Sequence, residues 1–362
     1  MNARFGVEEE FFFLDPSTLA PVSLGSSARE SVLGEDFPGT VAAEFLTCQI
    51  EHATSPVITI EQARAQLGAF RAHLTRHAEG DVLLGAGMGT PYGTASSTAV
   101  SDSDRYRTIA RWLGDIVGEH QVNGLHVHVE IPDADDRVRA LNALRPWLPV
   151  LLAISTNSPF WHGRDTEFGS WRTILLRRFP TIGSPPPFRD ADHYRAYVDR
   201  LVELGAAPDA ASLSWLARIS ERFPTVEVRV FDAQLAAEDT LLFAALTRAL
   251  LTSAIAPETH METDAIDTSL WMAAREGLDA RILNPMSAGV SDARALVPLM
   301  LRMLTPALQA TGDFDFVTDR LARLLAEGTG ADRQRRAFAR GGINGLRSLL
   351  APASEAWVPD SA

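Results

Sequence analysis

The chain lacks lysine altogether, so its 33 lysine-or-arginine positions are all arginine. This absence excludes a phosphate-loop lysine, a lysine that forms a Schiff base and a lysine general base. Phosphate would have to be held by arginine, by backbone N–H groups or by a metal ion. Any phosphate chemistry in this protein therefore depends on guanidinium groups or on metal.

Cysteine is almost as scarce, since Cys48 is the single one in 362 residues. One cysteine cannot form an intramolecular disulfide or a multi-cysteine zinc site, and a reducing cytoplasm is the expected location. Cys48 falls on the apolar face of a predicted strand, so we expect it to be a buried filler.

Long apolar runs and excess positive charge are also missing. No uninterrupted apolar stretch approaches the ~20 residues of a membrane-spanning helix, and residues 1–4 lead directly into the first predicted strand. We therefore expect neither a membrane span nor a signal peptide. The formal net charge of -13 argues against nucleic acid and anionic membranes as partners, because both attract basic surfaces. Small molecules are the expected partners.

Three consecutive glutamates interrupt the first predicted strand, Phe5–Phe13, which otherwise consists mainly of Phe and Val. Because a strand alternates its faces, Glu8 and Glu10 lie on one face and Glu9 lies on the other. Glutamate is a poor strand former and adjacent like charges repel, so we expect a bound cation to stabilise these carboxylates. We interpret this strand as one wall of a magnesium–nucleotide site.

Three further predicted strands each have one apolar face and one face with polar, titratable or aromatic side chains. These faces carry Thr47, Gln49 and Glu51 in 45–52, His126, His128 and Glu130 in 125–131, and Glu227, Arg229 and Phe231 in 226–231. A single strand of this kind is also typical of an antiparallel sheet with one face in water. The set of strands together favours a cleft.

Carboxylates gathered in such a cleft would raise one another's pKa and take up protons unless a cation were present. Mg²⁺ is suited to this place because it takes oxygen ligands and keeps positions for water and nucleotide phosphates.

The remaining pattern indicates an α+β fold with one mostly antiparallel sheet and helices on one face. We find no internal repeat or interdomain linker, so residues 1–362 are interpreted as one domain. Helices are expected at 60–77, 101–119, 133–156, 191–204 and 212–221 and over most of the chain after 237, a short strand at 82–84, and an irregular segment at 159–188.

Four segments together resemble the glutamate–cysteine ligase type 2 family, also described as carboxylate–amine ligases of the glutamine-synthetase-like superfamily. They are Gly6–Glu10, Glu44–Glu51, Gly124–His128 and Glu227–Arg229, and the resemblance extends to the arginine-rich stretch 334–336. It implies a curved antiparallel sheet that forms an active-site funnel, with ATP at one end and glutamate at the other. It also implies a homodimer.

The resemblance also implies roles for individual residues. Glu8, Glu10, Glu44, Glu51 and Glu227 match the metal-binding acids of the family. Arg229, Glu10 and His126 are the expected catalytic residues, and His126, His128, Arg229 and Arg335 are expected to bind the nucleotide. Glu44 and Glu51 have opposite strand parity, so a shared site requires a bulge or a strand end between them.

The activity implied is ATP-dependent ligation through an acyl phosphate, with Mg²⁺ and an amine such as cysteine. Two alternatives stay open at this point. His126-x-His128 also suits a metal-dependent hydrolase, and the same fold could serve a non-catalytic nucleotide or amino-acid binder.

Two weaker signals lie outside these motifs. Arg172, Arg177 and Arg178 could hold a substrate carboxylate or be ordinary surface arginines. The glycines of 85–89 could form a tight turn or contact a ligand through their backbone N–H groups.

Overall fold

The computed structural model describes residues 3–24, 32–33, 38–81, 84–95, 99–253, 261–287 and 289–351. The strands are β1 Phe5–Leu14, β2 Thr40–Ala43, β3 Gln49–Ala53, β4 Leu84–Ala86, β5 Gly124–Glu130, β6 Phe160–Trp161, β7 Arg164–Asp165, β8 Ala217–Ile219, β9 Thr225–Asp232, β10 Arg281–Leu283 and β11 Val290–Asp292. The α-helices are α2 Ile60–Asp81, α3 Asp104–Leu113, α4 Ala134–Leu144, α5 Leu148–Ser155, α6 Trp171–Leu176, α7 Ala191–Glu203, α8 Ala237–Thr252, α9 Thr263–Glu276, α10 Ala293–Thr311, α11 Phe314–Glu327 and α12 Gly330–Leu350. Short 3₁₀ helices occupy η1 Gly114–Glu119, η2 Arg145–Trp147, η3 Ala210–Ser212 and η4 Gly277–Asp279.

Seven strands form one sheet in the order β2-β3-β1-β5-β9-β8, with β4 paired to the far end of β1. Every neighbouring pair in it is antiparallel. The first strand is central, because it pairs with β3 on one side and, on the other, with β5 along its first half and with β4 at its far end. The predicted α+β class with an antiparallel sheet is confirmed.

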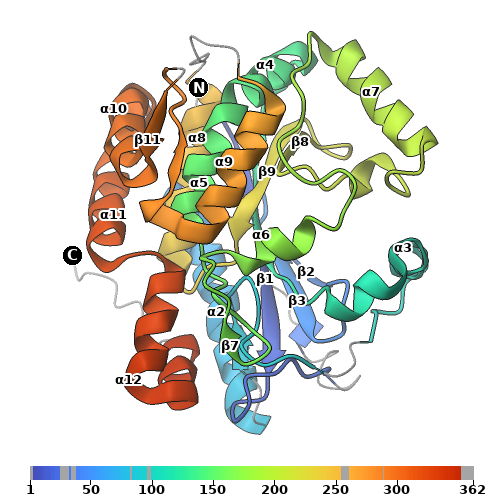
Figure 1. Ribbon diagram of the computed structural model, residues 1–362, viewed down its shortest axis with the longest axis vertical. Coiled ribbons are helices and arrows are strands. Elements are labelled where there is room, and N and C mark those ends of the chain that lie inside the picture. The colour runs from blue at the N-terminus through green and yellow to red at the C-terminus, as the bar shows by residue number, and fades with distance from the viewer. Residues whose placement is uncertain are drawn as a thin grey trace.

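Helices cover one face of this sheet in two layers (Figure 1). The inner layer, α4, α5 and α8, contacts the central strands, and α9, α10 and α11 pack outside it. The apolar residues of β5, Leu125, Val127 and Val129, are fully buried against these helices. The opposite face of the sheet therefore carries the polar side chains that the alternation predicted.

A β-bulge interrupts the pairing of β5 with β9. Leu125 pairs with Phe231 and Val127 with Val228, so two residues of β9, Arg229 and Val230, lie opposite one residue of β5. A bulge reverses the strand's face alternation beyond it. Phe231 consequently packs against the helices, stacked on Phe243 of α8 at 5.2 Å between ring centroids, and our prediction that it lies on the polar face is wrong.

Two predicted helices differ in the structure. The segment 212–221 is not helical but contains β8, whose hydrogen bonds to β9 come from outside the segment and cannot be seen in its local pattern. The long helix predicted over 133–156 breaks into α4, η2 and α5, since Pro146 and Pro149 each lack a backbone N–H.

The predicted strand at 82–84 lies partly outside the described residues, and β4 begins at Leu84. The glycines that follow it serve close packing rather than a turn. A Cβ at Gly87 would lie 2.3 Å from the Gln234 carbonyl oxygen, and one at Gly89 would lie 2.8 Å from the Asp232 carboxyl carbon. Among the described residues, no helix is long and apolar enough to cross a membrane.

Candidate active site

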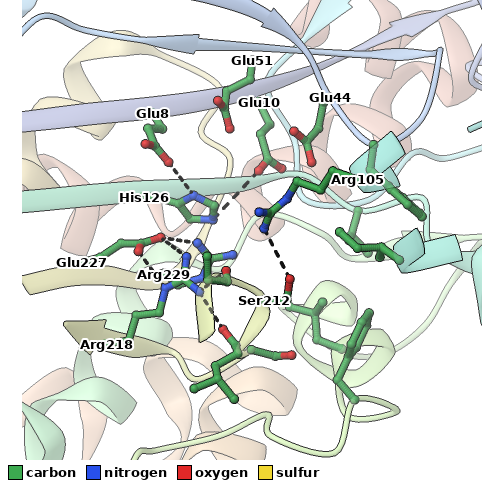
Figure 2. Close-up of a pocket in the computed structure, with 18 of the residues that line it drawn as sticks. Glu8, Glu10, Glu44, Glu51, Arg105, His126, Ser212, Arg218, Glu227 and Arg229 are labelled. Carbon is green, nitrogen blue, oxygen red and sulfur yellow. Dashed lines mark hydrogen bonds and ion pairs between the residues drawn. The ribbon is translucent and has the colours of Figure 1, made fainter. Parts of the chain in front are cut away.

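A cavity of about 400 Å³ opens on the polar face of the sheet (Figure 2). This volume lies within the roughly 300–1,000 Å³ typical of ligand pockets. Eight of the nine residues that the sequence analysis assigned to the site line it: Glu8, Glu10, Glu44, Glu51, His126, His128, Glu227 and Arg229. The sheet therefore brings together acids that are more than 200 residues apart in the chain.

Strand register explains this convergence. Glu10 pairs with Glu51 across β1 and β3, and Glu8 pairs with His126 across β1 and β5. His128 pairs with Glu227 across β5 and β9. Directly opposite residues on one face of an antiparallel pair have neighbouring side chains. The site is thus a row of cross-strand pairs on four adjacent strands.

Glu44 reaches this row by a different route. The predicted strand at 45–52 begins only at Gln49, after a turn in which the Gln49 N–H donates to the Leu46 carbonyl at 3.0 Å. This strand end between Glu44 and Glu51 is what their opposite parity required. Tyr106, near the start of α3, donates its hydroxyl to Glu44 Oε2 at 3.2 Å.

Glu8 lies between the two histidines of β5. Its Oε2 is 3.0 Å from His126 Nδ1, and its Oε1 is 3.2 Å from His128 Nε2. Burial alone would raise the pKa of Glu8, but the two imidazoles outweigh it and hold the pKa well below the ordinary value. Glu8 is therefore a charged carboxylate with partners of its own.

His126 is buried and neutral. Burial, reinforced by nearby Arg229, lowers the pKa of His126 to about 4. Because Glu8 is an acceptor, the single ring proton belongs on Nδ1, which leaves the Nε2 lone pair facing Glu10 Oε1 at 3.9 Å. A carboxylate that orients a histidine in this way is the usual outer partner of a metal-binding imidazole.

Glu227 is paired with two arginines. Arg218 of β8 donates from Nε to Glu227 Oε2 at 2.8 Å, and Arg229 forms a close ion pair with Oε1. Burial would raise the pKa of Glu227, but Arg229 and Arg218 outweigh it and lower the pKa far below its ordinary value. The bulge beside Arg229 lets this side chain face the cavity while the next two residues turn to the core.

Within the described part of the chain, no arginine forms an ion pair with the other three acids. Burial, together with repulsion from Glu44, raises the pKa of Glu10 to about 8, although the Gly124 N–H donates to Glu10 Oε2 at 2.6 Å. Burial also raises the pKa of Glu44, and burial with repulsion from Glu8, Glu44 and Glu10 raises the pKa of Glu51 well above its usual range. Glu10 is buried and Glu44 and Glu51 are partly buried, and nearby Arg229 offsets only part of the rise in their pKa values.

Two triplets of side chains have the spacing of metal ligands. Glu8, Glu51 and His126 form one and Glu8, His128 and Glu227 form the other, each with ligand atoms within 4.8 Å of one another. Carboxylate-rich sets of this kind suit a hard divalent cation such as Mg²⁺. The donor set and the uncompensated acids beside it therefore fit divalent metal.

Arg172 was one of three candidate arginines, and the structure separates it from the other two. It lies on α6, is 4% exposed and lines the cavity. Two of its nitrogens, Nε and Nη1, have no hydrogen-bond partner, while Nη1 is 3.9 Å from Asp232. Gly124 makes room for it, since a Cβ there would lie 2.6 Å from Arg172 Nη2. Arg178 instead pairs with Glu119 at 2.6 Å, and neither it nor Arg177 lines the cavity.

Arg335 corrects the sequence analysis. It does not line the cavity but donates from Nε and Nη2 to the Asp165 carboxylate, each at 2.8 Å, and from Nη2 to the Phe168 carbonyl at 2.9 Å. Its donors are therefore engaged in tying α12 to the β6–β7 hairpin, and its position does not support the expected contact with nucleotide.

Sequence reasoning missed Arg218 and Tyr106. Arg218 was hidden by the helix predicted over 212–221, although Ala217–Ile219 contains a branched residue that favours a strand. Tyr106 had no distinguishing local signal. It is placed by the N-cap of α3, where the Ser103 hydroxyl accepts from the Tyr106 N–H at 3.1 Å.

Two solved structures share this fold. The glutamate–cysteine ligase of Francisella tularensis in complex with AMP matches with a TM-score of 0.73 and 13% identity, covering 97% of this chain and 88% of that one. A bifunctional glutathione synthetase from Pasteurella multocida matches with a TM-score of 0.71 and 15% identity, covering 96% of this chain and 52% of that one. The fold is therefore that of the glutamine-synthetase-like ligases.

Sequence comparison identifies the family. The model of glutamate–cysteine ligase family 2 (GCS2) matches residues 4–351. A relative from Saccharopolyspora erythraea, provisionally named glutamate–cysteine ligase 2-2, is 40% identical, covering 98% of this chain and 93% of the relative. A relative of the same provisional name from Mycolicibacterium vanbaalenii is 38% identical over 98% of each chain. The chain belongs to glutamate–cysteine ligase family 2, and it is an ATP-dependent carbon–nitrogen ligase.

Proposed function

We propose that the protein activates the γ-carboxylate of glutamate, or of a closely similar acid, as an acyl phosphate and joins it to an amine. The observation that carries this proposal is the cavity itself, where buried acids without a cation adjoin two arginines on β8 and β9. Such a site can hold the metal-bound phosphates of ATP beside a carboxylate substrate.

The nucleotide phosphates belong at the β8–β9 end of the row. Arg218 and Arg229 are there, and guanidinium groups are the available phosphate ligands in a chain without lysine. Phe223 lines the same end of the cavity and is 49% exposed, so it offers a ring to the base. The triplet Glu8, His128 and Glu227 would hold a metal ion at this end.

The carboxylate substrate belongs beside Arg172. This guanidinium is buried, lines the cavity and has two unpartnered nitrogens, which is a costly arrangement unless a ligand completes it. The Arg172 charge also lies near Glu10, whose pKa it lowers against the larger effect of burial. A substrate carboxylate held here would lie between the arginine and the acids.

The reaction has two steps. A carboxylate oxygen attacks the γ-phosphorus of ATP, the bond from that phosphorus to the bridging oxygen breaks, and ADP leaves. The amine nitrogen then attacks the acyl carbon, the bond from carbon to the phosphate oxygen breaks, and inorganic phosphate leaves as the nitrogen gives one proton to water. Arg229 stabilises the charge of the transferring phosphoryl group, and the rigid sheet orients the reactants.

Divalent metal would be held by Glu8, Glu51, Glu227 and the two histidines, with Glu10 and Glu44 close by. When bound, it supplies charge neutralisation to the phosphate oxygens.

The hydrolase alternative is not favoured. Both histidines contact Glu8, and each possible metal triplet contains one histidine and two glutamates. A non-catalytic role is not favoured for a member of a ligase family. The cytoplasmic location and the homodimer stay predictions.

Hydroxylamine tests the first step alone, because this small nucleophile traps an acyl phosphate whatever the natural amine is. We expect γ-glutamyl hydroxamate and stoichiometric ADP only when Mg²⁺, ATP and glutamate are all present. Arg172→Lys should raise the KM for glutamate about tenfold to hundredfold, the cost of losing charge-assisted hydrogen bonds, and leave the KM for ATP unchanged. If the wild-type protein forms no hydroxamate with glutamate, the proposal fails.

A further inference from the structure

We propose that the acceptor amine of this ligase carries an aromatic ring, which packs on a row of five rings along one side of the cavity. This inference rests on the proposed function, since it concerns the second substrate of the same site. The five residues, called here the aromatic wall, are Phe45, Tyr106, Trp112, His120 and Phe179, and all of them line the cavity.

The rings of the aromatic wall follow one another at contact distance. The centroid of Phe45 is 5.6 Å from that of Tyr106 and 5.6 Å from that of His120. His120 is 5.1 Å from Phe179, which is 6.4 Å from Trp112. Aromatic pairs favour these separations, so a further ring from a ligand would add to an existing stack.

The aromatic wall offers rings rather than free charge. Burial, reinforced by Arg178 and Arg172, lowers the pKa of His120 to about 4, so its imidazole is neutral, and its Nδ1 has no hydrogen-bond partner. Arg105, a cation on the same side, is already engaged with Asp209 at 3.4 Å and with Ser212 at 3.3 Å (Figure 2). An acidic side chain on the acceptor would therefore find Arg105 already paired.

Aliphatic side chains continue this surface. They come from α3, from the segment before β5, and from α6 and the residues that follow it: Ile109, Leu113, Val122, Leu176 and Ile182. Burying an apolar ring against such a surface is favourable in proportion to the area removed from water. A small amine such as ethylamine would leave most of this surface exposed to water.

The aromatic wall begins beside the acids. The Tyr106 hydroxyl donates to Glu44 Oε2 at 3.2 Å and to the Ala43 carbonyl at 3.3 Å, which fixes the ring at that point. An acceptor whose ring packs on Phe45 and Tyr106 would have its amino group near Glu44 and Glu10. That is the side of the cavity where the acyl phosphate would form.

The nucleotide base is the competing occupant of the aromatic wall. Its phosphates require cations, and Arg218, Arg222 and Arg229 come from β8, β9 and the turn between them, where Phe223 offers a separate ring to the base. This charge distribution places the nucleotide away from the wall and leaves the wall for the amine.

Two matched pairs of amines test the proposal with the wild-type protein, Mg²⁺, ATP and glutamate. The pairs are 2-phenylethylamine with ethylamine, and phenylalanine with cysteine, and the readout is the amide product by mass spectrometry together with phosphate release. We expect the aromatic member to have at least a tenfold higher kcat/KM in one or both pairs. A ratio below tenfold in both pairs overturns the proposal.

Phe179→Ala locates the effect, and Phe168→Ala is the matched control. Phe168 packs on Trp171 and Trp271 and does not line the cavity. Phe179→Ala should raise the KM for 2-phenylethylamine about tenfold and the KM for ATP by less than twofold, whereas Phe168→Ala should change neither KM nor hydroxamate formation by more than twofold. An increase in the KM for ATP as large as that for the amine would assign the wall to the base and overturn the proposal.

The hydroxylamine reaction separates this inference from the proposed function. If hydroxamate forms but the aromatic amines show no preference, the aromatic acceptor is wrong and the acyl-phosphate ligase stands. If no hydroxamate forms, the proposed function itself has failed.

Discussion

Glu9 and Glu10 are neighbours on opposite faces of β1, and their surroundings differ in charge. On the helix side, Glu9 accepts two hydrogen bonds from Arg71 of α2, at 2.5 and 3.1 Å, and another from the Thr240 hydroxyl of α8. Arg71 in turn donates to the carbonyls of Gln234 and Leu235, each at 3.0 Å. This carboxylate is buried with a complete set of partners within the protein.

On the cavity side, the next residue is buried without a cation of its own. Glu10 receives one backbone hydrogen bond, and burial together with repulsion from Glu44 raises its pKa. Glu9 therefore has its counter-charge within the fold, whereas Glu10 has none until a ligand or metal binds. Three experiments test this contrast and a fourth tests the position of Arg335, beginning with the largest expected effect.

Replacing Glu10, the acid without a paired cation, should lower activity without lowering the stability of the fold. We expect Glu10→Gln to lower kcat by about 10³-fold, because the electrostatic arrangement around the transferred phosphoryl group is lost. The metal-free variant should melt at or above the wild-type temperature, since a neutral amide replaces a carboxyl group whose charged form is disfavoured. Full activity in a correctly folded Glu10→Gln protein would remove Glu10 from the site.

Replacing Glu9, the acid paired with Arg71, should lower the stability of the fold and leave the Mg²⁺ dependence of activity nearly unchanged. Glu9→Gln leaves the partly buried Arg71 guanidinium without its counter-charge. Breaking a fully buried pair typically costs about 3–5 kcal/mol of folding free energy, and we expect a loss toward the lower end of that range here. The expected result is a lower midpoint in urea unfolding, with the KM for Mg²⁺ of the surviving folded fraction within about threefold of wild type. A stable Glu9→Gln protein with weakened Mg²⁺ dependence would contradict the division between the two faces.

The pH dependence of stability should depend on metal. The raised pKa of Glu10, about 8, means that the folded state holds a proton that the unfolded chain releases near its ordinary value of 4.5. Stability from this group is therefore complete below about pH 4.5 and is lost as the pH rises through 8. We expect the melting temperature of the metal-free protein to fall between pH 5 and 8, and saturating Mg²⁺ to remove most of that fall. A metal-free melting temperature that rises over this window would refute the interpretation.

The smallest effect is expected at the arginine that the sequence analysis misplaced. Arg335→Ala removes contacts to Asp165 and Phe168, a partly exposed ion pair worth about 1 kcal/mol at most. The KM for ATP should change by less than about twofold. A tenfold increase would restore Arg335 to the nucleotide site.

The alternation of polar and apolar residues predicted most of the site. It placed Glu8, Glu10, His126, His128 and Glu227 on cavity-facing positions, because each lies in a strand with regular alternation. The resemblance added Glu44, which lies outside any strand and has no periodic signal.

What could not be predicted depends on contacts between distant residues. Arg71 is 62 positions from Glu9, and nothing near either residue indicates that they meet. The strand that carries Arg218 is defined by pairing with β9, and the reversal at Phe231 is defined by an extra residue relative to β5. The local sequence pattern divides each strand into two faces. It does not show which strand pairs with it or where a bulge changes the face on which a residue lies.

The bulge in β9 makes the strand unequally tolerant of changes in length. Removing Val230 would leave Phe231 two positions after Val228, so the pairing with β5 would become regular while Phe231 stayed in the core and Arg229 stayed on the cavity face. Adding a residue between Val226 and Val228, where the pairing is regular, would instead turn one side of the strand over and misplace Glu227 or Arg229. Changes at residues 221–223 would leave the strand intact but alter the cavity, because Arg222 and Phe223 line it. Val230 is therefore the position in this hairpin where losing one residue should disturb the site least.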